Sequence, residues 1–289
     1  MNKYVDEPGY ICRIQLALHS NFIKMINLFK KATILFLFLY LPFCGMAWGV
    51  LGHRIVGQIA DTYLTKKTKR EIFKILGNES VAMTSNWPDF IKSDPAYKYL
   101  DTWHYINFKS GLSETDLKNY LATDTLTDAY TKVNWLTGQL KNKELEQDKK
   151  IFYLRLLIHI VGDIHQPLHI GRPDDRGGNS VKVNWFKDPS NLHTVWDSKL
   201  IDFQQLSYTE YASSINYTTK ALRKEWQAEP VSDWIWQSYQ HTEKIYADTK
   251  PDATLSYEYN FKFIGVVNQQ LLKGGVHLAG LLNEIFGPL

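Results

Sequence analysis

The stretch LLIHIVGDIHQPLH, residues 156–169, places four titratable side chains in a run of otherwise apolar residues. Such a run is typical of a buried helix, where each polar group without a partner costs free energy. On this helix His159 and Asp163 are four residues apart and lie on one face. Pro167 ends the helix before His169, which could reach back beside them. An imidazole and a carboxylate aimed the same way can share a cation; the alternative is an ordinary buried His–Asp hydrogen bond.

A second His-x-x-x-Asp pair occurs in NLHTVWDSKL, where His193 and Asp197 repeat the spacing of the first pair. Nitrogen and carboxylate donors without sulfur favour zinc over softer metals or redox sites. We therefore predict a metal site built from both pairs and from candidates nearer the N-terminus, namely Asp89 in NWPDF, His104 in TWHYINF and His53 in WGVLGH.

Three further histidines are not assigned as metal ligands. His165 points away from His159 on the predicted helix, so we assign it a supporting or structural role. His241 and His277 have no neighbouring donors in the sequence and are interpreted as structural.

The first 47 residues read as a secretory signal peptide. Lys30 and Lys31 precede an apolar stretch, 32–43, that ends in Cys44-Gly45-Met46-Ala47. This stretch is too short to remain as a membrane anchor, and cleavage after Ala47 would make Trp48 the new N-terminus. A lipoprotein cysteine at Cys44 is the alternative, and the bulky Phe43 before it argues against that.

Residues 1–24 are atypical of a signal peptide, and we expect them to be a mis-assigned start upstream of the true initiator, Met25. Peptide mapping of the unprocessed precursor tests this, and a peptide that begins at Met1 would contradict it.

The processed chain is expected to be neutral and free of thiols. Both cysteines, Cys12 and Cys44, fall in the predicted signal peptide. Five of the 33 Lys and Arg residues and two of the 30 Asp and Glu residues also precede Trp48, which leaves 28 of each sign. The net charge is therefore near zero, and no basic surface field indicates a nucleic-acid partner. Without disulfides, a chain of this size can still be held together by its hydrophobic core.

Apolar periodicity predicts a mainly α protein with one short β element and no domain boundary after Trp48. A strand or hairpin is expected at 177–186, where Val181, Val183 and Trp185 alternate. The predicted helices are 50–64, 68–77 with a stop at Gly77, 124–140, 150–165, 208–226, 232–247 with Ser232 as N-cap, and 257–286.

From Trp48 to the C-terminus the chain resembles the S1/P1 nuclease family, zinc-dependent enzymes that cut single-stranded DNA and RNA and leave 5′-phosphorylated products. The resemblance implies a single helical domain of the phospholipase C/P1 nuclease type with a small β-hairpin, here residues 48–289. The motifs that carry it are Trp48-x-x-x-x-His53, Asp89, His104, His159-x-x-x-Asp163-x-x-x-x-x-His169, Gly177-Gly178-Asn179 and His193-x-x-x-Asp197.

The same resemblance implies a site for three Zn²⁺ ions in which Asp163 bridges two of them. The first ion would take Asp89, His104, His159 and Asp163. A neighbouring ion would take the amino nitrogen and carbonyl oxygen of Trp48, together with His53 and Asp163. The third would take His169, His193 and Asp197, with water in its open positions.

Substrate-side roles also follow from the resemblance. Lys92 would act beside Asp89 and Asp163 in catalysis by stabilising charge on the phosphate, and its alternative is a solvated surface lysine. Tyr105 occupies the family's base-stacking position but could equally belong to the core. Asn107 and Asn179 would add hydrogen bonds to the base or phosphate.

Two other functions are alternatives to the nuclease. Zinc-dependent phospholipases C share the fold, the N-terminal tryptophan and the trinuclear site, but the short Trp48 to His53 spacing and Asp197 in place of glutamate argue against them. A non-catalytic binding module stabilised by zinc conflicts with open water positions, because structural zinc sites are usually closed. We expect a secreted or periplasmic monomer without a stable membrane anchor after cleavage, acting on single-stranded DNA, RNA and nucleotides; 3′-nucleotidase activity stays open.

Overall fold

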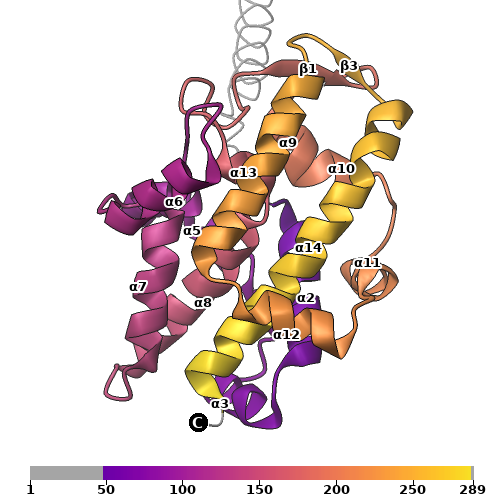
Figure 1. Ribbon diagram of the computed structural model, residues 1–289. Coiled ribbons are helices and arrows are strands. Elements are labelled where there is room, and N and C mark those ends of the chain that lie inside the picture. Colours follow the sequence, from indigo (N-terminus) through magenta and orange to yellow (C-terminus); the bar gives the residue numbers. More distant parts are fainter. Residues whose placement is uncertain (1–47, 288–289) are drawn as a thin grey trace, which may run out of the picture. The chain divides into compact units, whose positions relative to one another are not determined.

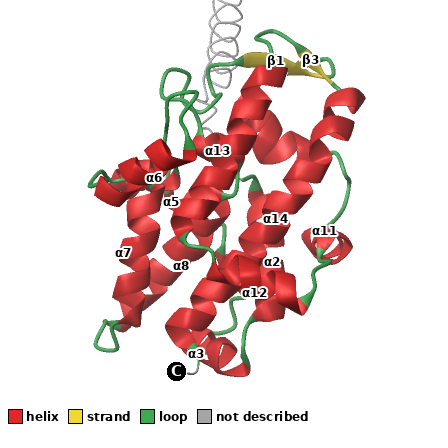
Figure 2. Cartoon of the chain, in the orientation of Figure 1, coloured by secondary structure: helices red, strands yellow, loops and turns green. Residues whose placement is uncertain are grey.

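The computed structural model describes residues 48–287 and shows a mainly helical protein with one small sheet (Figures 1 and 2). The mainly α fold is therefore confirmed, while the predicted signal peptide lies outside the described residues. The helices are α2 (Val50–Tyr63), α3 (Lys66–Leu76), α4 (Val81–Thr84), α5 (Trp87–Ile91), η1 (Pro95–His104), α6 (Glu114–Thr123), α7 (Ala129–Lys141), α8 (Gln147–Ile164), η2 (Pro167–Ile170), α9 (Leu192–Thr194), η3 (Val195–Lys199), α10 (Leu200–Asp202), α11 (Tyr208–Ile215), α12 (Lys220–Ala228), α13 (Val231–Asp248) and α14 (Tyr257–Phe286).

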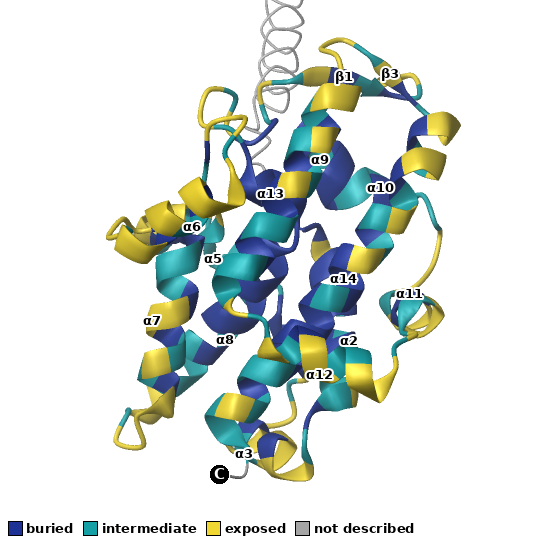
Figure 3. Ribbon diagram, in the orientation of Figure 1, coloured by how far each residue is buried: buried dark blue, intermediate teal, exposed yellow. Residues whose placement is uncertain are grey.

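Helix α8 lies inside the helical assembly and carries the central part of the site. Every residue from Leu156 to Ile164 is buried, as expected for a helix that is apolar on all sides (Figure 3). It packs against α2, α7 and α14. Helix α14, 30 residues long, runs beside α2 and forms the most extensive helix pair of the fold (Figure 1). No helix among residues 48–287 combines the length and apolar character needed to cross a membrane.

Two predicted helices begin or divide differently from the sequence prediction. The helix predicted at 124–140 starts only at Ala129, because Asp128 caps it in a reciprocal capping box with Thr131. The helix predicted at 208–226 is two helices, α11 and α12, separated by residues 216–219. Thr219 accepts a hydrogen bond from the Leu222 N–H and so caps α12, a local signal that the apolar periodicity had concealed.

Helix ends are partly as predicted. The stop at Gly77 is confirmed: its φ is +65°, and its N–H bonds the carbonyl of Phe73. The N-cap predicted at Ser232 is wrong, since α13 begins at Val231, directly after Pro230.

The β element is a hairpin extended by a third strand (Figure 2). Strands β1 (Lys182–Trp185) and β2 (Asp188–Asn191) pair antiparallel, with Lys182 opposite Asn191. Strand β3 (Thr254–Leu255) pairs parallel with β1 just before α14. A two-residue strand is too short to show alternation in the sequence, so only the hairpin was predictable.

Candidate metal centre

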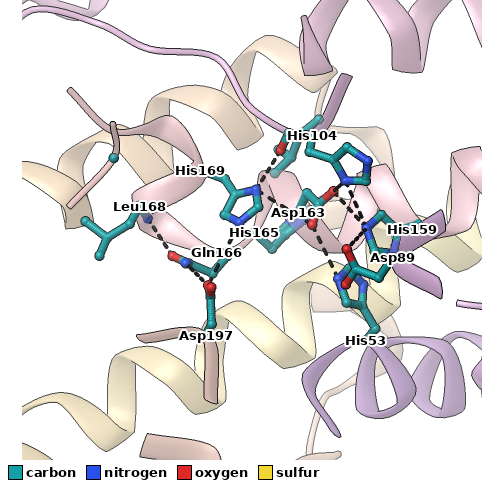
Figure 4. A network of polar contacts seen from close by, with 12 residues as sticks. His53, Asp89, His104, His159, Asp163, His165, Gln166, Leu168, His169 and Asp197 are labelled. Carbon is teal, nitrogen blue, oxygen red and sulfur yellow. Dashed lines mark hydrogen bonds and ion pairs between the residues drawn. The ribbon is translucent and has the colours of Figure 1, made fainter. Parts of the chain in front are cut away.

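Helix α8 brings His159 and Asp163 together on one face, and other elements deliver donors to them (Figure 4). His159 Nε2 lies 3.3 Å from Asp163 Oδ2, and His104 Nδ1 lies 2.9 Å from the same oxygen. The other oxygen, Oδ1, lies 3.3 Å from His53 Nε2. The two carboxylate oxygens therefore face two different sets of histidines, which is the arrangement that a bridging ligand requires.

The distances between donor atoms match those around a single ion. Four ligands at 2.0–2.1 Å in a tetrahedron stand about 3.3 Å apart. His104 Nδ1 and His159 Nε2 are 3.0 Å apart, and Asp89 Oδ1 lies 3.9 Å from His159 Nε2. Asp89, His104 and His159 thus form one compact group of possible ligands, and His53, His159 and Asp163 form another.

The third group combines His169 of η2 with donors from α9 and η3. His193 Nε2 is 3.1 Å from Asp197 Oδ2, and His169 Nε2 is 3.9 Å from Asp197 Oδ1. His193 is on α9 and Asp197 on η3, a single turn of π-helix, a feature that often marks functional sites. Both His-x-x-x-Asp pairs of the sequence therefore face inward as predicted, and His169 does reach back past Pro167.

Backbone carbonyls hold three of these histidines in one orientation. The Nδ1 atoms of His159, His169 and His193 each lie 2.6 Å from a carbonyl oxygen, those of Ser85, His104 and Gly177 respectively. An imidazole that donates from Nδ1 keeps its Nε2 lone pair for a metal. Gly177 adopts φ +63°, a conformation that suits glycine and turns its carbonyl toward His193.

His53 reaches the centre only because residue 162 has no side chain. The His53 ring stacks on His159, with ring centroids 3.9 Å apart. A Cβ added to Gly162 would lie 2.7 Å from His53 Nδ1, closer than any real contact. Nothing in the sequence marks this glycine, which looks like an ordinary residue of a helix interior.

We expect Gly162→Ala to push His53 away from Asp163, weaken metal binding and destabilise the protein by about 1–3 kcal/mol through overpacking. Gly138→Ala is the matched control, because Gly138 is also helical and has open space around its Cβ position. The control should be neutral or stabilising by up to about 1 kcal/mol. Thermal unfolding and metal titration of both variants check this; equal behaviour of the two would contradict it.

Gln166 is a second residue that sequence reasoning missed. It is fully buried, donates from Nε2 to Asp197 Oδ1, and accepts from the Leu168 N–H at 2.6 Å (Figure 4). A glutamine two residues after the end of α8 is no signal by itself, because its burial and its contact with Asp197 arise only in the folded chain. Its contacts fix which way the Asp197 carboxylate points, and such supporting bonds commonly matter for metal affinity.

Gln166→Ala should lower metal affinity at the His169, His193 and Asp197 group by about 10- to 100-fold, because Asp197 loses the bond that orients it. Competition against a coloured chelator measures this affinity. Gln204→Ala removes a comparable amide that bonds Leu200 and Asn260 instead, and it should leave the affinity unchanged. An unchanged affinity in Gln166→Ala would refute the orienting role.

The buried histidines and aspartates of the three groups do not satisfy one another's charges and hydrogen bonds. Burial raises the pKa of Asp163 well above its usual range and lowers the pKa values of His53 and His169 well below theirs. For Asp89, burial acts in the opposite direction, but the positive charges of His159 and Lys92 prevail and lower its pKa. Buried atoms without a hydrogen-bond partner include Asp163 Oδ1, Asp89 Oδ2, and Nε2 of His53 and His169. Cations would satisfy these atoms, and an all-nitrogen-and-oxygen donor set suits zinc.

The residues predicted on the substrate side lie beside this centre. Lys92 Nζ is 3.0 Å from Asp89 Oδ1 and its side chain is only 22% exposed, so it is not a freely solvated lysine. Tyr105 is 39% exposed, while its neighbours Ile106 and Phe108 are buried. The backbone of this segment pairs with η2, since the Ile106 N–H bonds the carbonyl of His169. Tyr105 is thus presented to solvent rather than buried in the core.

Asn107, Asn179 and Trp48 are placed less directly. Both asparagines are partly exposed, and Asn179 donates its amide to the carbonyl of Arg176. The Trp48 side chain is fully buried, and the next residue, Gly49, donates its N–H to the carbonyl of Asp197 at 2.7 Å. The ligand role of the Trp48 backbone stays a prediction, as do the substrate roles of the asparagines.

His165 and His277 have structural partners. His165 Nε2 lies 2.7 Å from His277 Nδ1, and its Nδ1 lies 2.7 Å from the carbonyl of Val161. His277 stacks on Trp234 and pairs with Glu229. His241 belongs to none of the three donor groups.

A mainly helical protein with three adjoining His/Asp groups, each able to hold a metal ion, is the class that fold and site define. The sequence model described as S1/P1 Nuclease matches residues 48–287, almost all of the chain after the predicted signal peptide. The chain therefore belongs to the S1/P1 nuclease family.

Individual relatives agree with this placement. Endonuclease 5 of Arabidopsis thaliana is 30% identical over 280 residues, which cover 83% of this chain and 91% of that protein. Nuclease S1 of Aspergillus oryzae (strain ATCC 42149 / RIB 40) is 26% identical, covering 82% of this chain and 91% of its own length. Nuclease P1 of Penicillium citrinum is 25% identical, and the match covers 83% of this chain and 98% of that protein.

Proposed function

We propose that this protein is an exported, zinc-dependent endonuclease that hydrolyses single-stranded DNA and RNA to 5′-phosphorylated products. The observation that carries the proposal is the shared Asp163, whose two oxygens face separate sets of histidines. Membership of a metal-dependent nuclease family supports the reaction class. Three donor groups support a count of three ions, and their nitrogen and oxygen atoms support zinc.

The charge of the proposed centre suits a phosphodiester substrate. Zinc would supply Lewis acidity toward a phosphodiester and lower the pKa of water from about 16 toward 7. Three divalent ions would carry six positive charges, and Asp89, Asp163 and Asp197 would neutralise three of them. The site would therefore hold a concentrated positive charge. A phosphate would be attracted to this point even though the predicted mature chain as a whole is neutral.

Lys92 and Tyr105 are the residues proposed to touch the substrate. The Lys92 ammonium stands beside Asp89 and could stabilise charge on the phosphate as it builds up. Tyr105 offers a partly exposed ring on which any base can stack. A base held on such a platform must leave its duplex stack, which favours unpaired strands.

The rival functions have less support. The family match over residues 48–287 favours a nuclease over a phospholipase C. A non-catalytic module is disfavoured by the donor set of the third group, where His169, His193 and Asp197 supply fewer than the four ligands of a closed structural site.

The test is hydrolysis of a single-stranded oligonucleotide by protein that begins at Trp48, with and without a chelator. Phosphatidylcholine serves as the competing substrate class. We expect chelator-sensitive release of 5′-phosphorylated products and no release of the lipid headgroup. Headgroup release from the lipid with an intact oligonucleotide would reassign the site to a phospholipase, and no turnover of either would favour the binding module.

Export is proposed from the signal-like residues 1–47 alone. N-terminal sequencing of protein recovered outside the cytoplasm should give Trp48 as the first residue. Recovery of the chain only inside the cell, with residues before Trp48 retained, would contradict export.

A further inference from the structure

A second feature suited to nucleic acid lies outside the metal centre. A cavity of about 550 Å³ opens between η1, α7 and α8, on residues that the proposed reaction does not use. Its walls are mainly aromatic and include Tyr99, Trp103, Trp135, Phe152 and Tyr153. A volume of this size lies in the range of pockets that hold small organic ligands.

The aromatic rings form a connected set, and two of them are partly exposed. Trp103 and Trp135 meet edge to face with ring centroids 6.0 Å apart, and Trp135 meets Tyr153 in the same way at 5.0 Å. Trp103 is buried and holds the set in the core, whereas Trp135 is 39% exposed and Tyr99 is 56% exposed. Both exposed rings therefore pack edge to face against Trp103 and remain partly accessible to a ligand.

One ammonium group, that of Lys132, stands beside the aromatic rings of the cavity. Lys132 Nζ stands 4.6 Å from the Trp103 ring centroid and 5.3 Å from that of Trp135. No carboxylate oxygen of residues 48–287 lies within 4.0 Å of this ammonium. Lys149 also lines the cavity, but Glu146 pairs with it, and the wall carries an acid, Asp148; Lys132 is therefore the cation placed to meet a phosphate. An aromatic surface with an ammonium beside it matches a base linked to a phosphate.

The cavity and the metal centre share two elements. Trp103 directly precedes the donor His104 on η1. Phe152 stands seven residues before His159 on α8, which is about 10 Å along a helix. A strand bound at the metal centre could therefore reach the cavity with nucleotides a few positions from the scissile bond.

We propose that this cavity is a second base-binding subsite for single-stranded nucleic acid, which stacks a base on Trp135 and Tyr99 and holds its phosphate with Lys132. The inference rests on the proposed function and deepens it: longer strands would bind more tightly than dinucleotides. None of the residues that line the cavity belongs to the three donor groups, so we expect the subsite to act on affinity rather than on the chemical step.

The test compares a 12-nucleotide single strand with a dinucleotide as substrates of the zinc-loaded enzyme. Trp135→Ala and Tyr99→Ala should each raise KM for the 12-mer by about tenfold, with kcat and all dinucleotide kinetics unchanged. Lys132→Gln should reduce the slope of log KM against log salt for the 12-mer by about 0.7. Tyr217→Ala, which removes an exposed ring elsewhere on the surface, is the control and should change nothing.

Three outcomes separate the possibilities. The expected pattern, a loss confined to the long substrate, supports the subsite. If every variant matches the unsubstituted enzyme in kinetics on both substrates and in unfolding temperature, the subsite is refuted while the nuclease assignment stands. Failure of the unsubstituted enzyme to cut either substrate would instead refute the proposed function on which the subsite depends.

Discussion

Asp163→Asn should reduce hydrolysis of a single-stranded oligonucleotide by about 10³-fold or more. Metal ions at phosphoester centres contribute several kcal/mol of transition-state stabilisation, and 4 kcal/mol corresponds to about 10³ in rate. Among residues 48–287, Asp163 is the carboxylate whose oxygens face both His53 and the pair His104 and His159. An amide cannot supply two anionic oxygens, so we expect metal affinity to fall at two of the groups together.

Folding should survive this substitution, because asparagine has nearly the shape of aspartate and removes a carboxylate that burial disfavours. Circular dichroism and metal analysis of the purified variant check the two points separately. Asp61→Asn, which removes a partly exposed carboxylate paired with Lys69, is the matched control and should keep full activity. A folded Asp163→Asn enzyme with near-normal rate and metal content would disprove the bridging role.

The second large effect concerns the start of the processed chain. A protein that carries a few extra residues before Trp48 should lose most of its activity and bind one zinc ion fewer. An α-amine can coordinate zinc only when no peptide bond occupies its nitrogen and when it is deprotonated. The structure supports a fixed position for this backbone, since Trp48 is buried and Gly49 is bonded to the carbonyl of Asp197.

The control for this experiment adds the same residues after Leu289 instead. That protein should retain its metal and its activity, because none of the three donor groups lies near the C-terminal helix end in sequence. If the N-terminally extended protein is as active as the protein that begins at Trp48, the predicted role of the Trp48 α-amine as a zinc ligand is wrong. The other donors would then suffice to bind the metal.

Sequence patterns predicted the parts of this molecule that depend on local periodicity and spacing. Helix α8 and its ligand face follow from the His159 to Asp163 spacing within an apolar run, and α2 and α14 from long apolar repeats. The three donor groups contain eight of the predicted ligands, because motif order carried information that single residues lacked.

Features that depend on contacts between distant segments were not predictable. Gly162 matters because α2 passes beside it, and Gln166 matters because η3 brings Asp197 to its amide. Neither relation leaves a periodic signal along the chain. The aromatic cavity likewise joins Tyr99, Trp135 and Phe152 from three elements, and each ring alone reads as a core residue.

The most direct test of the account is the metal content of the protein that begins at Trp48, measured by elemental analysis after dialysis against buffer free of added metal. We predict about three zinc ions per chain, together with loss of nuclease activity on their removal and its return on zinc addition. A fully folded and active enzyme that contains no metal would contradict the assignment of His53, Asp89, His104, His159, Asp163, His169, His193 and Asp197 as its metal centre.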